Sequence, residues 1–152
     1  MDDLRAFLER EKVDAELIDL GVPMTTAQAA ADQLHIPVGS IFKSLVMCNT
    51  EGKAFVVVLP GDARVDQKAV ARAVSTKKVK FAPEDVVLRE TGYPAGGTPP
   101  LGHRKPLPVL VDEKLLGYEF GYGGGGRHEL LLKIRPDELV RVSKATVAPI
   151  SL

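Results

Sequence analysis

The first part of the chain alternates between helix-like and strand-like spacing of its apolar residues. Leu4, Phe7 and Leu8 follow the i, i+3, i+4 spacing of one helix face, which predicts a first helix. Residues 15–20 then have the composition of a short strand. A helix followed directly by a strand indicates a fold that mixes the two.

A second helix is predicted from the signals at its two ends. Thr25, followed by Gln28 three residues later, matches a capping box, and the alanine-rich run after it ends before Pro37. Two strands come next, at 41–48 and 54–59, and the polar segment with a glycine between them is typical of a hairpin. The second strand ends in five apolar residues without alternation, which predicts a central strand covered on both faces.

The rest of the chain continues the alternation of helices and strands. Helices are predicted at residues 66–74, 83–90 and 137–142, and strands at 79–81, 109–111 and 130–134. This order favours an α/β or α+β fold in which helices flank a mixed sheet. A length of 152 residues fits one domain, so residues 1–152 are expected to form a single unit.

Charge and composition mainly exclude kinds of partner and location. The 20 basic residues balance the 20 acidic ones, so we expect no DNA partner, and any nucleic-acid contact should be local. The single cysteine excludes an intramolecular disulfide, and the first residues have neither the basic nor the apolar region of a signal peptide. No apolar run approaches the roughly 18 residues of a membrane span. The sequence therefore predicts a cytoplasmic protein without a membrane partner.

A segment rich in glycine and proline, residues 91–102, is the strongest candidate for chemistry. Glycine lets a ligand approach the backbone, and proline removes competing N–H groups, so selected amides stay exposed. Such amides bind a phosphate, an oxyanion or a carbonyl oxygen. The alternative is an ordinary surface loop between a helix and a strand. The spacing of a Walker or dinucleotide loop is missing, which disfavours a phosphate-loop enzyme for small molecules.

Lysines supply the second group of candidates. Lys43 interrupts an apolar strand face that also carries Ile41, Leu45 and Met47. A lysine there loses hydration unless a ligand or partner meets its ammonium group; alternatively, the strand lies at a rim and the side chain reaches water. Further cations could form a basic rim for phosphates or simply be solvated surface: Lys77, Lys78, Lys80, Arg104, Lys105 and Arg127.

The histidines and the cysteine predict no metal site. His35, His103 and His128 lie far apart in the sequence, and together with Cys48 they lack the spacing of metal ligands. Cys48 falls in a strand, where it fits a small core residue better than a nucleophile. His103 directly follows the glycine loop and either reaches a site there or lies on the surface. We therefore expect no metal and no other cofactor.

The order of these features resembles the YbaK family of aminoacyl-tRNA deacylases, which is similar to the editing domain inserted in bacterial prolyl-tRNA synthetases. The resemblance covers nearly the whole chain, and the segments that carry it are Thr25-Thr26 with its helix, 38–46, 57–66, 91–102 and 109–113. It implies a mixed sheet curved toward a barrel and flanked by helices. It also implies a free-standing enzyme that hydrolyses the ester between a wrongly attached amino acid and its tRNA, on tRNA(Pro) or another tRNA that carries a small amino acid.

The same resemblance implies the site residues. Lys43 falls at the lysine that is important in the family, where it would bind the terminal phosphate or ribose and help neutralise developing charge. Gly96 and Gly97 are expected to polarise the ester carbonyl or to hold the terminal ribose, without a metal. The ribose hydroxyl is expected to assist because no protein base is evident. The substrate-binding residues implied are Gly92, Tyr93, Pro94, Thr98, Pro100, Gly102, His103, Gly124 and Gly125. Phe42, Met47 and Ala95 are expected to line the pocket with Pro94.

Two functional interpretations stay open. The first is a deacylase whose substrate is the acceptor end of aminoacyl-tRNA, with an aminoacyl-tRNA synthetase as a candidate partner. The second is a non-catalytic module of the same fold that binds an aminoacyl-tRNA or nucleotide end. The second is kept because Ala95 precedes Gly96 where the stricter form of the loop has proline, and because Pro99 replaces a frequent small hydroxyl residue.

Overall fold

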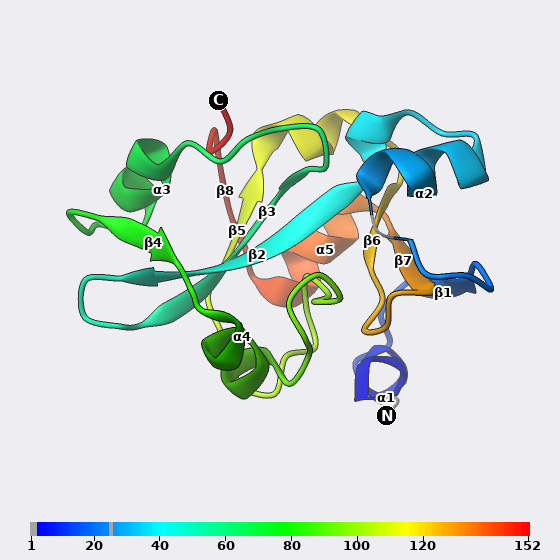
Figure 1. Cartoon of the computed structure of the whole chain (residues 1–152), viewed down its shortest axis with the longest axis horizontal. Helices are drawn as coiled ribbons and strands as arrows, with labels where there is room; N and C mark the ends of the chain where they lie inside the picture. Colours follow the sequence, from blue (N-terminus) through cyan, green and yellow to red (C-terminus); the bar gives the residue numbers. More distant parts are fainter. Residues whose placement is uncertain (1–2, 25) are drawn as a thin grey trace.

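The computed structural model describes residues 3–24 and 26–152, and the strands in this part of the chain form two sheets (Figure 1). The five-stranded sheet has the order β4 (Val79–Phe81), β2 (Phe42–Asn49), β3 (Ala54–Pro60), β5 (Val109–Asp112) and β8 (Thr146–Ala148). The three-stranded sheet has the order β1 (Ala15–Asp19), β7 (Leu130–Ile134) and β6 (Gly121–Gly124). The α-helices are α1 (Asp3–Arg10), α2 (Ala27–Leu34), α3 (Gln67–Ala73), α4 (Glu84–Thr91) and α5 (Pro136–Ser143).

Strand β3 lies at the centre of the larger sheet. It pairs antiparallel with β2, through the predicted hairpin, and parallel with β5 on its other side. Val56, Val57, Val58 and Leu59 are each 0 % exposed, which confirms the prediction of a strand covered on both faces. Burial of each of these side chains stabilises the fold by roughly 1.5–3 kcal/mol before the loss of conformational entropy is counted.

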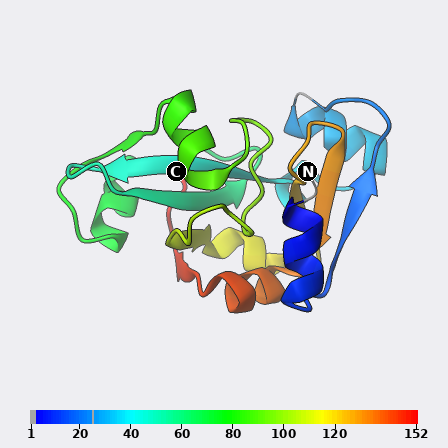
Figure 2. The same cartoon turned by 90° about the horizontal axis from the view of Figure 1, so that it is seen from below.

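Helices cover both faces of this sheet. On one face, side chains of α1, α4 and α5 such as Leu4, Val87 and Leu139 pack with the β3 residues Val56 and Val58 in one core cluster. On the other face, the α3 residues Val70 and Ala71 pack with Val57 and Leu59 in a second cluster. Figure 2 shows the helices on the two sides of the sheet, and the arrangement confirms the predicted mixed sheet flanked by helices.

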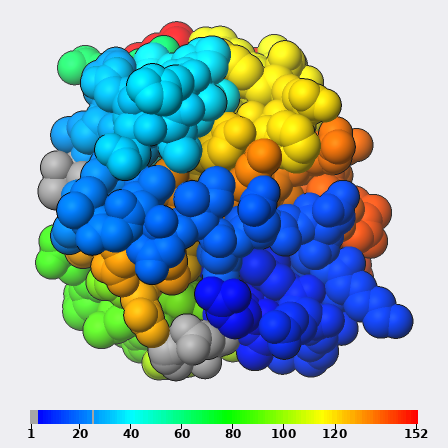
Figure 3. Space-filling model, turned by 90° about the vertical axis from the view of Figure 1, so that its right-hand side faces the viewer, coloured from blue at the N-terminus to red at the C-terminus, as the bar shows by residue number. Residues whose placement is uncertain are grey.

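The smaller sheet brings together an early and a late segment of the chain. β1 pairs antiparallel with β7, and Figure 3 shows the N-terminal segment against the segment that contains β6 and β7. A single bridge between Ile41 and Tyr122 joins β2 to β6 among the described residues. The two sheets therefore do not close, and the expectation of a barrel-like sheet is corrected to two adjoining open sheets.

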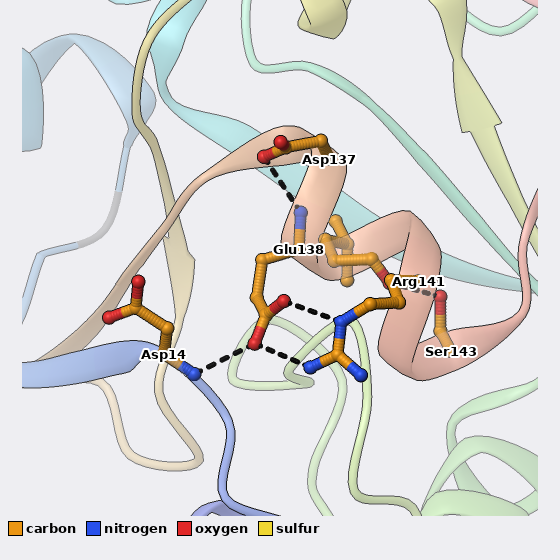
Figure 4. Close-up of polar contacts among 6 residues, drawn as sticks. Asp14, Asp137, Glu138, Arg141 and Ser143 are labelled. Carbon is orange, nitrogen blue, oxygen red and sulfur yellow. Dashed lines mark hydrogen bonds and ion pairs between the residues drawn. The ribbon is translucent and has the colours of Figure 1, made fainter.

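A carboxylate on α5 ties this helix to the segment before β1 (Figure 4). The two oxygens of Glu138 accept hydrogen bonds from Arg141, each at 2.8 Å, and Oε2 also accepts from the backbone N–H of Asp14 at 2.8 Å. The guanidinium of Arg141 stabilises the charged carboxylate, so the pKa of Glu138 lies below its ordinary value. The contact links α5 to the smaller sheet.

The predicted elements are present, and their ends lie within one residue of the predicted bounds where bounds were given. The start of α2 differs in detail, because Thr26 caps the helix by accepting from the Ala29 N–H at 3.0 Å, while Gln28 bonds Asp32 instead of closing a capping box. Thr25, the predicted cap, lies outside the described residues. The sequence did not predict β6, which consists of glycine and tyrosine, or the short and largely exposed β8. No helix in the described ranges is long and apolar enough to cross a membrane.

Candidate functional site

A pocket of about 280 Å³ lies against an open edge of β2. β4 pairs with β2 at Met47–Asn49, and β6 meets the same edge at Ile41, so the stretch between these contacts has no neighbouring strand. The pocket occupies this gap between α2, β6 and the glycine loop. Its lining residues are Met24, Thr26, Ala27, Ala30, Ile41, Phe42, Lys43, Ser44, Leu45, Gly61, Gly96, Thr98, Gly123, Gly124 and Leu131.

Lys43 is the charged residue of this lining. Its side chain is half-buried and makes no hydrogen bond or ion pair with the residues that the structure describes. No aspartate or glutamate lines the pocket among these residues. The uncompensated ammonium group therefore favours an anionic ligand or a group on which negative charge develops.

Ser44 brings polar groups to the same place, and sequence reasoning missed it. The carbonyl of Val46 accepts from the Ala82 N–H at 2.9 Å, so the backbone of Val46 faces the β4 edge of β2. Backbone direction repeats every two residues in a strand, which places the N–H and C=O of Ser44 at the same edge, where no strand pairs with them. The Oγ of Ser44 is also buried without a hydrogen-bond partner among the described residues. A ligand in the pocket can satisfy these groups.

The glycine loop folds into a tight turn at the pocket. The Gly97 N–H donates to the carbonyl of Pro94 at 3.1 Å, and Thr98 Oγ1 donates to the same oxygen at 3.1 Å. The Gly97 amide is thus used inside the loop, whereas the Gly96 amide has no hydrogen-bond partner in the described ranges. Of the two predicted carbonyl-polarising amides, Gly96 is the one available to a ligand.

Glycines of β6 let the loop and β2 approach closely. A Cβ at Gly124 would collide with the carbonyl group of Thr98, and a Cβ at Gly123 would collide with the ring of Phe42. Gly124 and Thr98 both line the pocket, so this backbone-to-backbone contact forms one of its walls. The wall requires glycine because there is no room for any side chain.

Several predicted site residues lie away from this pocket. Tyr93 is 7 % exposed and packs in the core cluster that includes residues of α1. Met47 is 0 % exposed and does not line the pocket, so the expectation that it does is wrong. Gly92 ends α4 with a φ of 85°, which glycine adopts without strain. The structure also leaves the following residues outside the lining: Pro94, Ala95, Gly97, Pro100, Gly102, His103 and Gly125.

The basic rim that the sequence suggested is divided between distant places. Lys105 is paired with Glu90 at 2.7 Å, and Arg104 lies against Gly92. Lys77, Lys78 and Lys80 lie instead next to or on β4. No group of three His, Cys, Asp or Glu side chains in the described part of the chain could hold a metal ion.

His128 is a neighbour of the loop to which sequence reasoning gave no role. A Cβ built on Gly97 would lie 3.5 Å from His128 Cδ2, so the exposed imidazole lies directly beside the glycine turn. Its distance in sequence from residues 91–102 left no signal of this contact. The histidine belongs to the surroundings of the pocket, and it does not line it.

His103 is expected to make the protein less stable as the pH falls below about 6.5. Burial lowers the pKa of His103, although its Nε2 donates to the Pro99 carbonyl at 2.7 Å, so the unfolded chain takes up a proton before the folded one does. Stability is therefore lost from the unfolded-state pKa downward. Scanning calorimetry between about pH 7 and 5 should show a smaller fall in Tm for His103→Gln than for the wild type. His128→Gln, at an exposed histidine, is the control. Equal slopes of Tm against pH for all three proteins would contradict this role of His103.

Known proteins share both this fold and this sequence pattern. Residues 22–142 match the family model described as "Aminoacyl-tRNA editing domain". A protein of Enterococcus faecalis named "Putative Cys-tRNA(Pro)/Cys-tRNA(Cys) deacylase EbsC" is 29 % identical over 126 residues, covering 83 % of this chain and 77 % of that protein. A "Proline–tRNA ligase" of Fervidobacterium nodosum is 28 % identical over 120 residues, which are 78 % of this chain but 21 % of that longer protein.

A solved structure gives the same result for the fold. The crystal structure titled "putative trans-editing enzyme for prolyl tRNA synthetase" superimposes with a TM-score of 0.92 at 32 % identity, and the match covers 99 % of this chain and 95 % of that one. The family model, the sequence relatives and this structure agree with the resemblance carried by the strand with Lys43 and by the glycine loop, residues 91–102. The chain belongs to the family of aminoacyl-tRNA editing domains, and its relatives are named as deacylases and trans-editing enzymes.

Proposed function

We propose that this protein is a free-standing editing hydrolase that removes a wrongly attached amino acid from tRNA. The observation that carries the proposal is the unpaired Lys43 ammonium group at a pocket where polar groups of Ser44 and Gly96 also lack partners in the described part of the chain. Such groups suit an ester whose carbonyl oxygen becomes negative during hydrolysis. The expected location is the cytoplasm, where tRNA is charged.

The chemistry is the addition of water to the ester carbonyl. As the water oxygen bonds to the carbonyl carbon, negative charge develops on the carbonyl oxygen, and the Lys43 ammonium group or the Gly96 N–H stabilises it. The bond from carbon to the ribose oxygen then breaks, and that oxygen takes a proton. We assign no protein general base, because no acidic or histidine side chain lines the pocket among the described residues. The neighbouring ribose hydroxyl is proposed to assist the proton transfer.

The substrate is proposed to be tRNA(Pro), or another tRNA, that carries a small amino acid. A volume of about 280 Å³ is close to the lower end of small-molecule sites, which begin at roughly 300 Å³. A pocket of this size fits a small aminoacyl group better than a large one, with the adenosine held nearer the rim. The names of the relatives, which refer to Cys-tRNA(Pro) and to proline–tRNA ligase, support tRNA(Pro).

A deacylation panel tests the proposal. The purified protein is incubated with tRNAs charged with alanine, cysteine, serine, threonine and proline, and loss of the ester is followed against reactions without protein. We expect rapid loss for one or two of the small amino acids and persistence of the correctly paired esters. A parallel series with EDTA tests the proposed independence from metal, which would be refuted by a loss of activity restored on adding a divalent cation.

A binding module without turnover is the second candidate. It is favoured by Ala95, which stands where the stricter loop has proline, and by the Gly97 amide, which is already used by Pro94. Such a module would bind aminoacyl-tRNA in the same assays and leave the ester intact across the whole panel. Ester loss that depends on the protein excludes this candidate.

A further inference from the structure

We propose that the end of the molecule formed by the β2–β3 turn and β4 holds phosphates of the tRNA backbone, away from the pocket that takes the ester. This inference rests on the proposed function, because it assigns a second contact region to the same substrate. The surface is defined here as the lysine edge and consists of Lys53, Lys77, Lys78 and Lys80. Figure 1 shows the turn and β4 at the opposite end of β2 from α2 and β6, which border the pocket.

The four cations of the lysine edge are available to a ligand. Each is exposed, and none makes an ion pair with a residue in the described ranges, whereas Lys105, Arg135 and Arg141 elsewhere on the surface are all paired. Glu51 in the turn is the acidic residue nearest in sequence, and Glu84 and Asp85 begin α4 beyond the far end of β4. In a chain with a formal net charge of zero, this concentration of unpaired positive charge favours a polyanion.

A groove gives the lysine edge a defined shape. A hollow of about 390 Å³ is lined by Lys78 and Lys80 on one side and by Asn49, Thr50 and Gly52 of the turn on the other. Lys78, just before β4, and Lys80 flank the buried Val79 and both line the hollow; two residues along an extended backbone correspond to about 6.6 Å. Two cations at this separation can contact phosphates of one strand, and the groove beside them leaves room for the backbone.

The pairing of the strands places β4 along the same edge of β2 as the pocket. β4 pairs with the same edge of β2 whose open stretch borders the pocket, and Lys80 lies opposite Cys48. Cys48 lies five positions after Lys43, which corresponds to about 17 Å along the strand. At roughly 3.4 Å per stacked nucleotide, this is the length of about five nucleotides. With the 3′ end in the pocket, the lysine edge would meet phosphates near the start of the acceptor stem.

Neutralising two lysines tests the proposal. Lys78→Gln/Lys80→Gln is compared with the wild type and with Lys12→Gln/Lys144→Gln, which removes the same charge at two other exposed positions. Hydrolysis is measured on charged full-length tRNA and on a charged CCA trinucleotide that cannot reach the lysine edge. We expect KM for the full-length tRNA to rise roughly three- to tenfold and kcat to stay unchanged. The slope of log kcat/KM against log salt concentration should become less steep by about one to two. Cleavage of the trinucleotide should not change.

Binding of uncharged full-length tRNA, followed by fluorescence anisotropy, separates this inference from the proposed function. If the wild type hydrolyses no ester, weaker tRNA binding by the Lys78/Lys80 variant alone still supports the lysine edge. The inference is overturned if the wild type binds no tRNA, if the variant and the remote control behave alike, or if full-length and trinucleotide substrates are affected equally. Unchanged tRNA kinetics and binding in the variant would also overturn it and leave an acidic protein as the alternative partner.

Discussion

Replacing Lys43 by alanine is expected to lower kcat/KM for ester hydrolysis by roughly 100- to 1,000-fold, the loss typical when a group that stabilises an oxyanion is removed. Lys43 is the charged group of the pocket lining, and no second cation among the described residues lines the pocket to take over its role. Because the side chain is half-buried and unpaired among the described residues, the fold should lose little. We expect Tm to change by less than about 2 °C.

Two further variants make the Lys43 experiment specific. Lys12→Ala removes an exposed lysine that lies outside the pocket lining and should leave the rate unchanged. Lys43→Arg keeps the charge in a wider, planar group and should recover only part of the rate, since arginine cannot reproduce the position of an ammonium group. Deacylation by Lys43→Ala at the wild-type rate would show that the site lies elsewhere.

The second large effect is expected from Gly124→Ala. A methyl group at this position would collide with the backbone carbonyl of Thr98, which the turn around Pro94 and Gly97 holds in place. Either β6 or the loop must move, and this displaces the Gly96 amide from the pocket. We expect a loss of activity of at least about tenfold, together with an overpacking cost of about 1–3 kcal/mol, which lowers Tm by roughly 3–10 °C.

Gly117→Ala is the matched control for Gly124→Ala. A Cβ at Gly117 would meet no atom within 4 Å, and the residue has no positive φ, so the same chemical change should affect neither Tm nor the deacylation rate. Thermal unfolding and the deacylation assay are run on both variants. A Gly124→Ala protein that unfolds and reacts like Gly117→Ala would contradict the tight contact between β6 and the loop.

Local signals in the sequence predicted most of the secondary structure. The apolar run in β3, the glycine in the β2–β3 turn and the proline before α4 each act through the nearest residues, so they can be read without the fold. β6 escaped prediction because Gly121, Gly123 and Gly124 lack the side chains by which a strand is recognised. Those glycines are required by Phe42 and Thr98, which approach them from distant parts of the sequence.

The candidate site was predicted only in part for the same reason. Lys43 and the glycine loop stood out because a charge in an apolar strand and a cluster of glycine and proline are unusual in themselves. Ser44 was missed since an exposed strand edge is a property of its neighbours: β4 is too short to pair along the whole of β2. Tyr93 and His103 were included because they are close in sequence, yet their side chains lie away from the pocket.

The sequence by itself determined most of the elements, their order and, through the resemblance carried by the strand with Lys43 and the glycine loop, the family. These depend on local conformational preferences and on sequence motifs, both of which can be recognised without the fold. The tertiary structure decided which of the candidates meet, because the gap beside β2 exists only where β4 and β6 leave it unpaired. It also showed that the suggested basic rim is not one surface. Lys105 pairs with Glu90, whereas the lysine edge has no ion pair in the described ranges, because distances between side chains are set by packing and not by spacing along the chain.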